Sequence, residues 1–193
     1  MKFVSKRTQS RRLAALYARM SQAFATAAPE NFTCEGCTQN CCVSHFQHHT
    51  YLEWHYLWEG LDALPEGKRA EYLGRARDNV AQTREALAHG EVPRVMCPVN
   101  EDGRCGLYEH RLMICRMYGV PNMIVTRSGL RQFPGCPVCM DLLKGNTDAI
   151  VDRTPLYREL ANLEMELLGS RRNIMPKVDM TLAEMIVAGP PKV

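Results

Sequence analysis

The 193-residue sequence lacks any continuous apolar run near the roughly 18 residues that a membrane-spanning helix needs. It also lacks a secretory signal, which needs an unbroken apolar stretch of roughly 7–15 residues, because six basic side chains interrupt the first 20 residues. We therefore expect a cytoplasmic protein with no membrane partner. A transit peptide is the alternative, because the segment is amphipathic and no acidic residue occurs before Glu30.

Common catalytic signatures are missing as well. Neither Gly-x-Ser-x-Gly, typical of serine hydrolases, nor Gly-x4-Gly-Lys-Ser/Thr, typical of phosphate-binding loops, occurs in the chain. There is no evident glycine-rich strand-to-helix turn of the kind that holds a nucleoside cofactor. Internal repeats and low-complexity tracts are also absent. If the protein is an enzyme, its catalysis depends on a metal.

The composition is that of an ordinary globular protein, with 46% apolar and 23% charged residues. Helical periodicity and turn signals predict a mainly α fold, in which helices surround an irregular cysteine-rich metal-binding centre with a small β-hairpin. We expect three parts: a basic amphipathic N-terminal helix (1–28), a cysteine-cluster metal-binding domain (29–145) and a C-terminal helical segment packing on the same core (146–193).

Capping and periodicity place the individual helices. Capping boxes at 50–53 and 181–184 predict helix starts, and Pro65 and Thr154-Pro155 open two further helices. Residues 123–126 and 130–133, separated by Arg-Ser-Gly, predict a hairpin. The expected apolar face of the N-terminal helix (1–28) consists of Leu13, Leu16, Met20 and Phe24. Those of the helices that begin near residues 65 and 154 consist of Leu73, Ala76, Val80, Thr83 and Leu87, and of Leu156, Leu160, Leu163 and Leu167.

Charge is unevenly distributed, because residues 1–29 hold six basic side chains and no acidic one. We interpret this segment as a helix that docks on the core with a solvated basic face. The alternative is a contact with nucleic acid or an acidic partner. Nucleic acid is not favoured, because aromatic residues do not alternate with the basic ones as they do on nucleic-acid platforms.

Nine cysteines are the unusual feature of the composition. In a reducing compartment, clustered cysteines bind metal more often than they form disulfides. They form a Cys-x2-Cys-x3-Cys-Cys group, three single residues and a closing Cys-x2-Cys pair. We predict that the whole set ligates metal: Cys34, Cys37, Cys41, Cys42, Cys97, Cys105, Cys115, Cys136 and Cys139.

The spacing of the cysteines allows several thiolates to bind one metal ion. A turn of the Cys-x2-Cys type aims two sulfurs at one ion, and a helical segment would place residues 34, 37 and 41 on one face. Buried hydrophobic cysteine is the alternative for any one member, such as Cys42 or Cys97. An odd total leaves at least one cysteine outside any pair of complete four-thiolate sites.

Four thiolates suit Zn²⁺ and an iron–sulfur cluster alike. We favour iron–sulfur, as one or two 4Fe-4S clusters, because nine thiolates exceed the need of one structural zinc. Arg104, Arg111 and Arg116 flank two of the cysteines, and their charges would offset the charge of such a centre; the alternative is that they are ordinary surface arginines. His45 and His48 are additional candidates, for which a helix face is the more common explanation.

The cysteine motifs match a known pattern. Cys34-Glu-Gly-Cys37-Thr-Gln-Asn-Cys41-Cys42, Cys97-Pro-Val, Gly103-Arg-Cys105-Gly-Leu-Tyr and Cys115-Arg-Met-Tyr-Gly resemble the YkgJ-like cysteine-cluster family, described as zinc- or iron-chelating proteins. The resemblance covers residues 32–140. It implies metal binding by seven cysteines, and the last two lie where a further cysteine segment often follows. Arg111-Leu112 stands where the family usually has Arg-Pro, which leaves that turn less rigid.

Three functions follow as hypotheses. The first is an iron–sulfur protein acting in electron transfer or cluster-assisted chemistry, with a protein redox partner. The second is a zinc-stabilised interaction module. The third is a metal-dependent enzyme with an open coordination position.

Overall fold

The fold is known from a computed structural model that describes residues 5–35, 37, 41–144, 146 and 150–193. The predicted mainly α class is confirmed: the structure is 56% helical, with seven α-helices in its described residues. The chain divides into two compact units, one of residues 1–33 and 113–175 and one of residues 34–112 and 176–193. The predicted three-part division along the sequence stays a prediction.

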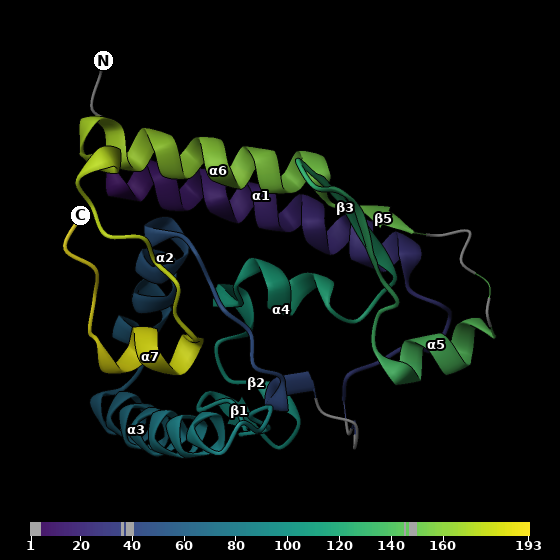
Figure 1. Ribbon diagram of the computed structural model, residues 1–193, viewed down its shortest axis with the longest axis horizontal. Coiled ribbons are helices and arrows are strands. Elements are labelled where there is room, and N and C mark those ends of the chain that lie inside the picture. The colour runs from purple at the N-terminus through teal and green to yellow at the C-terminus, as the bar shows by residue number, and fades with distance from the viewer. Residues whose placement is uncertain (1–4, 36, 38–40, 145, 147–149) are drawn as a thin grey trace. The chain divides into compact units, whose positions relative to one another are not determined.

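Unit 1 is built around two long helices that run side by side, α1 (Lys6–Ala27) and α6 (Thr154–Leu168) (Figure 1). Their predicted apolar faces are confirmed, since Leu13, Leu16 and Leu163 are at most 1% exposed. The remaining elements of this unit are α4 (Met113–Met117), β3 (Asn122–Thr126), β4 (Gly129–Phe133), α5 (Pro137–Leu143), β5 (Val151–Asp152) and the 3-10 helix η3 (Gly169–Asn173).

The predicted hairpin is confirmed as β3 and β4, which pair antiparallel with Asn122 opposite Phe133 and Ile124 opposite Arg131. Strand β5 pairs parallel with β3 on its other side, so the strand order is β4-β3-β5. The side chain of Thr154, at the start of α6, accepts a hydrogen bond of 2.8 Å from the Val125 backbone. This bond ties the start of α6 to the middle strand.

Unit 2 contains α2 (Tyr51–Asp62), α3 (Glu66–Ala88), α7 (Leu182–Val187), the strands β1 (Asn100–Glu101) and β2 (Arg104–Cys105), and the 3-10 helices η1 (Cys41–Val43) and η2 (Tyr108–His110). Both predicted caps form, because the hydroxyls of Thr50 and Thr181 accept hydrogen bonds from backbone N–H groups three residues later. The indole N–H groups of Trp54 and Trp58 both donate to the Met185 carbonyl, which fixes α7 on α2.

The predicted apolar face of α3 is partly wrong. Ala76, Val80 and Thr83 are buried as expected, but Leu87 is 52% exposed. Tyr72 and Asn79 are buried instead, and Asn79 donates a 2.9 Å hydrogen bond to the Met96 carbonyl. These tertiary contacts set the rotation of the helix, which a tally of apolar residues does not capture. The helix also begins one residue later than expected, with Pro65 as its cap.

The basic face of α1 is partly neutralised within unit 1. Arg12 forms an ion pair with Glu166 of α6, and Arg19 forms one with Glu159. These pairs fit a helix docked on its own unit. Among the helices of the described residues, none is both long enough and apolar enough to cross a membrane.

Candidate metal centre

All nine cysteines lie in the described part of the chain as thiols, and the two units divide them unequally. Unit 1 holds Cys115, Cys136 and Cys139. Unit 2 holds the other six: Cys34, Cys37, Cys41, Cys42, Cys97 and Cys105. In unit 2, Cys34 is exposed and the other five thiols are half-buried. Unit 2 therefore holds the larger set of candidate ligands.

The first Cys-x2-Cys pair forms a turn, because the Cys37 N–H donates a 3.3 Å hydrogen bond to the Cys34 carbonyl. The next two cysteines open the 3-10 helix η1, which is continued by a 2.9 Å bond from the Ser44 N–H to the Cys41 carbonyl. The sequence allowed either a turn or a helix for the first cysteine group, and Cys34 and Cys37 form the turn. Gly36 and residues 38–40 lie outside the described residues.

A second hairpin, β1–β2, carries Cys105. It was not predicted from the sequence. Asp102 and Gly103 form its two-residue turn, with φ of +47° and +91°. Asp-Gly is a strong signal for this kind of turn, because both positions need positive φ. A Cβ atom on Gly103 would lie 3.8 Å from the Cys37 carbonyl oxygen, so the hairpin turn packs near the first cysteine pair.

Helix α3 fixes the hairpin. Arg75 donates 3.0 Å hydrogen bonds to the Asn100 carbonyl and the Glu101 carboxylate, and Lys68 adds an ion pair of 2.7 Å with Glu101. The Tyr72 hydroxyl lies against the end of the hairpin, since a Cβ on Gly106 would fall 1.9 Å from the Tyr72 oxygen. A side chain at position 106 would therefore displace Tyr72.

Three separate segments meet at Cys42. The Cys97 N–H donates a 2.9 Å hydrogen bond to the Cys42 carbonyl, and the Asn100 N–H donates one of 3.0 Å to the Cys97 carbonyl. Figure 1 shows the blue η1 turn next to β1 and β2. Cys105 is directly opposite Asn100, and opposite residues of an antiparallel pair share one face. Since the Asn100 side chain lies beside Cys42, Cys105 lies on the hairpin face toward it.

The Cys42 thiol is acidified, with its pKa lowered to about 6. A hydrogen bond from the Cys41 side chain is the chief cause; the Asn100 amide and the positive charge of Arg111 act in the same direction, and burial opposes them. The Asn100 Nδ2 atom is buried beside this thiol. The lowered pKa favours the thiolate of Cys42, the form that binds metal.

Arg111 is held by the segment that follows the hairpin. Its guanidinium carbon lies 3.7 Å from the centre of the Tyr108 ring, and that of Arg104 lies 5.0 Å from the same centre. Helix α2 supports this segment: the Tyr56 hydroxyl donates to the Glu109 carbonyl at 3.1 Å. Tyr108 itself is 42% exposed, so two guanidinium groups border an exposed aromatic ring next to the cysteines.

Arg116, the third arginine that flanks a cysteine in the sequence, belongs to unit 1. Arg116 is 7% exposed and its guanidinium carbon lies 4.4 Å from the centre of the Tyr17 ring, both within unit 1. In that unit, Cys136 and Cys139 are buried in an apolar cluster with Ala27 and Val120. The Cys136 sulfur accepts a 3.4 Å hydrogen bond from the Cys139 N–H, as in a ligand turn. Their ligation and that of Cys115 stay predictions.

Neither histidine gains support as a ligand. His48 is 3% exposed and its backbone exchanges hydrogen bonds of 2.8 and 3.1 Å with Met180. Burial is the main reason that its pKa is lowered. Among the described residues, no three His, Cys, Asp or Glu side chains are grouped closely enough to hold a metal ion.

The chain matches no protein-family model, no curated protein and no solved structure. The likeness to the YkgJ-like family therefore depends on the cysteine motifs alone and stays a prediction.

Proposed function

We propose that unit 2 is a metal-binding unit in which thiolates from the segment 34–42 and from residues 97–105 hold an iron–sulfur cluster, and that the protein transfers electrons in the cytoplasm. The observation that carries the proposal is the meeting of three cysteine-bearing segments at Cys42, through the bond from Cys97 and the register of Asn100 with Cys105. Cysteines that are distant in sequence are thereby brought to one region by backbone hydrogen bonds.

The donor set fits a soft metal centre. Cys41, Cys42, Cys97 and Cys105 supply four sulfurs, which is the number that a cluster or a zinc ion takes. The lowered pKa of Cys42 favours the deprotonated ligand. Binding requires these side chains to move, because no three potential ligands are grouped closely enough to hold a metal ion among the described residues.

Unit 2 alone carries six cysteines, two more than a single four-thiolate centre of either kind requires, so iron–sulfur stands as the prediction and zinc as its alternative. When bound, a cluster supplies one-electron redox chemistry. Arg111 contributes positive charge that offsets the negative charge of a four-thiolate centre. The exposed Tyr108 with its two arginines supports a protein redox partner that approaches this side of the unit.

The test is anaerobic purification followed by absorbance and elemental analysis. We expect a brown protein with broad absorbance near about 400 nm and bound iron and sulfide. Colourless protein that contains zinc would establish the alternative, a zinc-stabilised interaction module. Protein that retains neither metal would contradict both.

A variant series locates the ligands. Cys42→Ser and Cys97→Ser should abolish metal retention, because each removes a sulfur from the region where the segments meet. Ser44→Ala is the matched control, since it changes the residue just after η1 without removing a sulfur. Full metal content in both cysteine variants would show that neither Cys42 nor Cys97 is a ligand and would contradict the proposed centre. The remaining candidates would be Cys34, Cys37, Cys41, Cys105, Cys115, Cys136 and Cys139.

A further inference from the structure

A buried arginine in unit 1 has no role in the proposed centre. Arg153 follows β5 directly and caps α6, and it is only 5% exposed. Its backbone is fixed by a 2.9 Å hydrogen bond from its N–H to the Met123 carbonyl. Its guanidinium carbon lies 4.2 Å from the centre of the Phe133 ring and 5.0 Å from that of Tyr157. The charge is therefore placed between two aromatic rings.

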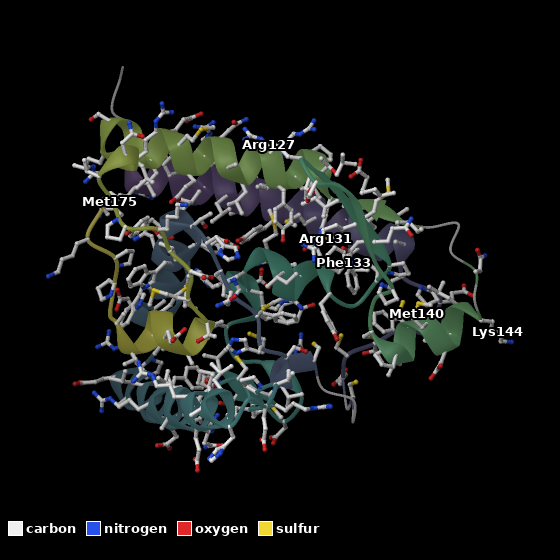
Figure 2. The ribbon with its side chains drawn as sticks, viewed as in Figure 1. Arg127, Arg131, Phe133, Met140, Lys144 and Met175 are labelled. Carbon is white, nitrogen blue, oxygen red and sulfur yellow. The ribbon has the colours of Figure 1, made fainter. Side chains whose placement is uncertain are left out.

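A second arginine approaches the same ring. Arg131 is two residues before Phe133 on β4, so both side chains project from the same face of the strand. Its guanidinium carbon lies 5.9 Å from the Phe133 ring centre. Figure 2 shows Arg131 and Phe133 close together on the hairpin, with Arg127 separate from them. Arg131 is exposed and Phe133 is half-buried, so part of the Phe133 side chain is accessible to solvent.

No carboxylate compensates this pair of charges among the described residues. The nearest acid in sequence, Asp152, uses its carboxylate to accept a 2.8 Å hydrogen bond from the Thr154 N–H. Arg153 has no ion pair there, and its Nε atom is buried without a hydrogen-bond acceptor. Burial is the main reason that the Arg153 pKa is lowered, and the charge of Arg131 lowers it further.

The same region holds a second unsatisfied atom. Asn122 is opposite Phe133 in the β3–β4 pair and is 2% exposed. Its Nδ2 donates to the Met117 and Val120 carbonyls, which fixes the amide orientation and leaves Oδ1 without a donor in the described residues. Buried polar atoms without partners cost free energy, so a donor and an acceptor left unsatisfied in one region of the sheet point to a missing ligand.

We propose that Arg153, Arg131 and Phe133 form a binding site for the phosphate group of a small ligand. Two guanidinium groups match the charge of a phosphate dianion, and each presents a planar fork that binds two of its oxygens. The one proton that an inorganic phosphate dianion keeps, or a hydroxyl elsewhere on a phosphorylated ligand, provides the donor for Asn122. The half-buried Phe133 ring offers a surface on which a planar part of the ligand stacks. The site is independent of the cysteines.

Isothermal titration calorimetry of the full chain at constant ionic strength tests the proposal, with inorganic phosphate and phenyl phosphate as probes and chloride as the reference anion. We expect both phosphates to bind and chloride to give no saturable heat. Tighter binding of phenyl phosphate would identify an aromatic phosphomonoester as the ligand class. Equal affinity for the two probes would identify free phosphate as the ligand. Absence of saturable phosphate binding would overturn the proposal.

Variants of single arginines locate the binding. Arg131→Gln should weaken phosphate binding about tenfold or more, the effect of losing charge-assisted hydrogen bonds. Arg153→Lys keeps the charge but loses the planar fork, and it should also weaken binding. Arg127→Gln, which removes one exposed charge at the tip of the same hairpin, is the control and should bind as the unaltered protein does. If Arg153→Lys fails to fold, Arg131→Gln decides, because Arg131 is exposed. An equal loss of phosphate affinity in Arg127→Gln, or no loss in Arg131→Gln, would contradict the proposed site.

Discussion

Gly103 is a single residue on which the geometry around the cysteines depends. Its φ of +91° lies in a region that residues with a Cβ rarely adopt. Together with Asp102 it reverses the chain between Asn100 and Cys105, and this reversal sets which residues share the hairpin face toward Cys42. The cysteine pattern alone contains none of this information.

Gly103→Ala should therefore lower the free energy of unfolding by about 1–2 kcal/mol, because alanine is strained at positive φ. Its methyl group has room, with no neighbouring atom closer than 3.8 Å, so the loss comes from the backbone. Gly74→Ala is the control. It lies inside α3 with nothing within 4 Å and should stabilise by about 0.5–1 kcal/mol. Urea denaturation measures both, and equal effects would contradict the argument.

His48 makes stability depend on pH. Its pKa is lowered in the folded protein, mainly by burial; His49 lowers it further and Glu53 opposes the shift. The unfolded chain therefore binds more protons on the acid side, where the ordinary histidine pKa is about 6.5. This contribution to stability is intact above that pH and is lost progressively as the pH falls below it.

His48→Gln should reduce the loss of stability between about pH 7.5 and about pH 5.5, because it removes the group that takes up a proton on unfolding. The measurement is urea denaturation at both pH values. His49→Gln, which alters an exposed neighbour, should still lose most of this stability between the two pH values. A pH dependence unchanged in His48→Gln would assign the effect to other groups.

At the scale of elements, local signals in the sequence were sufficient where a helix end depends on its own side chains. The second capping box is complete in the structure: the Thr181 hydroxyl accepts from the Glu184 N–H at 3.2 Å, and the Glu184 carboxylate accepts from the Thr181 N–H at 2.8 Å. The rotation of α3 was not predictable in this way, because the burial of Tyr72 and Asn79 depends on contacts with residues far along the chain.

Thr181→Ala should destabilise α7 by about 1 kcal/mol, the usual cost of losing an N-cap. Thermal or urea denaturation measures the change. Thr26→Ala provides the comparison, because that exposed hydroxyl lies within α1 and bonds only to the Gln22 carbonyl among the described residues. We expect its effect to stay within about 0.5 kcal/mol. Equal losses in the two variants would argue against a special role of the cap.

At the scale of the whole molecule, each unit is assembled from separated stretches of chain. The cysteine group at 34–42 and the single residues 97 and 105 belong to one unit, whereas Cys115 and the closing pair belong to the other. The sequence predicted nine ligands as one set. How they are divided between the units depends on the path of the chain, which no local pattern specifies.

If unit 2 holds the metal, removing the metal should loosen unit 2 more than unit 1. Chelation, or the Cys42→Ser change, should speed amide hydrogen exchange at Cys97 and in the β1–β2 hairpin by about tenfold or more, because ligand bonds contribute to folding. Exchange in α1 and α6, which carry no cysteine, should change less. Hydrogen-exchange mass spectrometry measures this, and equal acceleration everywhere would contradict the assignment to unit 2.

The sequence by itself determined the mainly α class, the helix caps, the hairpin of residues 122–133 and the presence of an unusual cysteine set, because each depends on residues within a few positions of one another. Only the tertiary structure decided that Cys97 bonds to Cys42 and that Cys105 is opposite Asn100. It also decided that Cys136 and Cys139 are buried among apolar side chains, and that Arg153 lies against two aromatic rings. These features depend on hydrogen bonds and burial between distant segments, and such contacts form only when the whole chain folds.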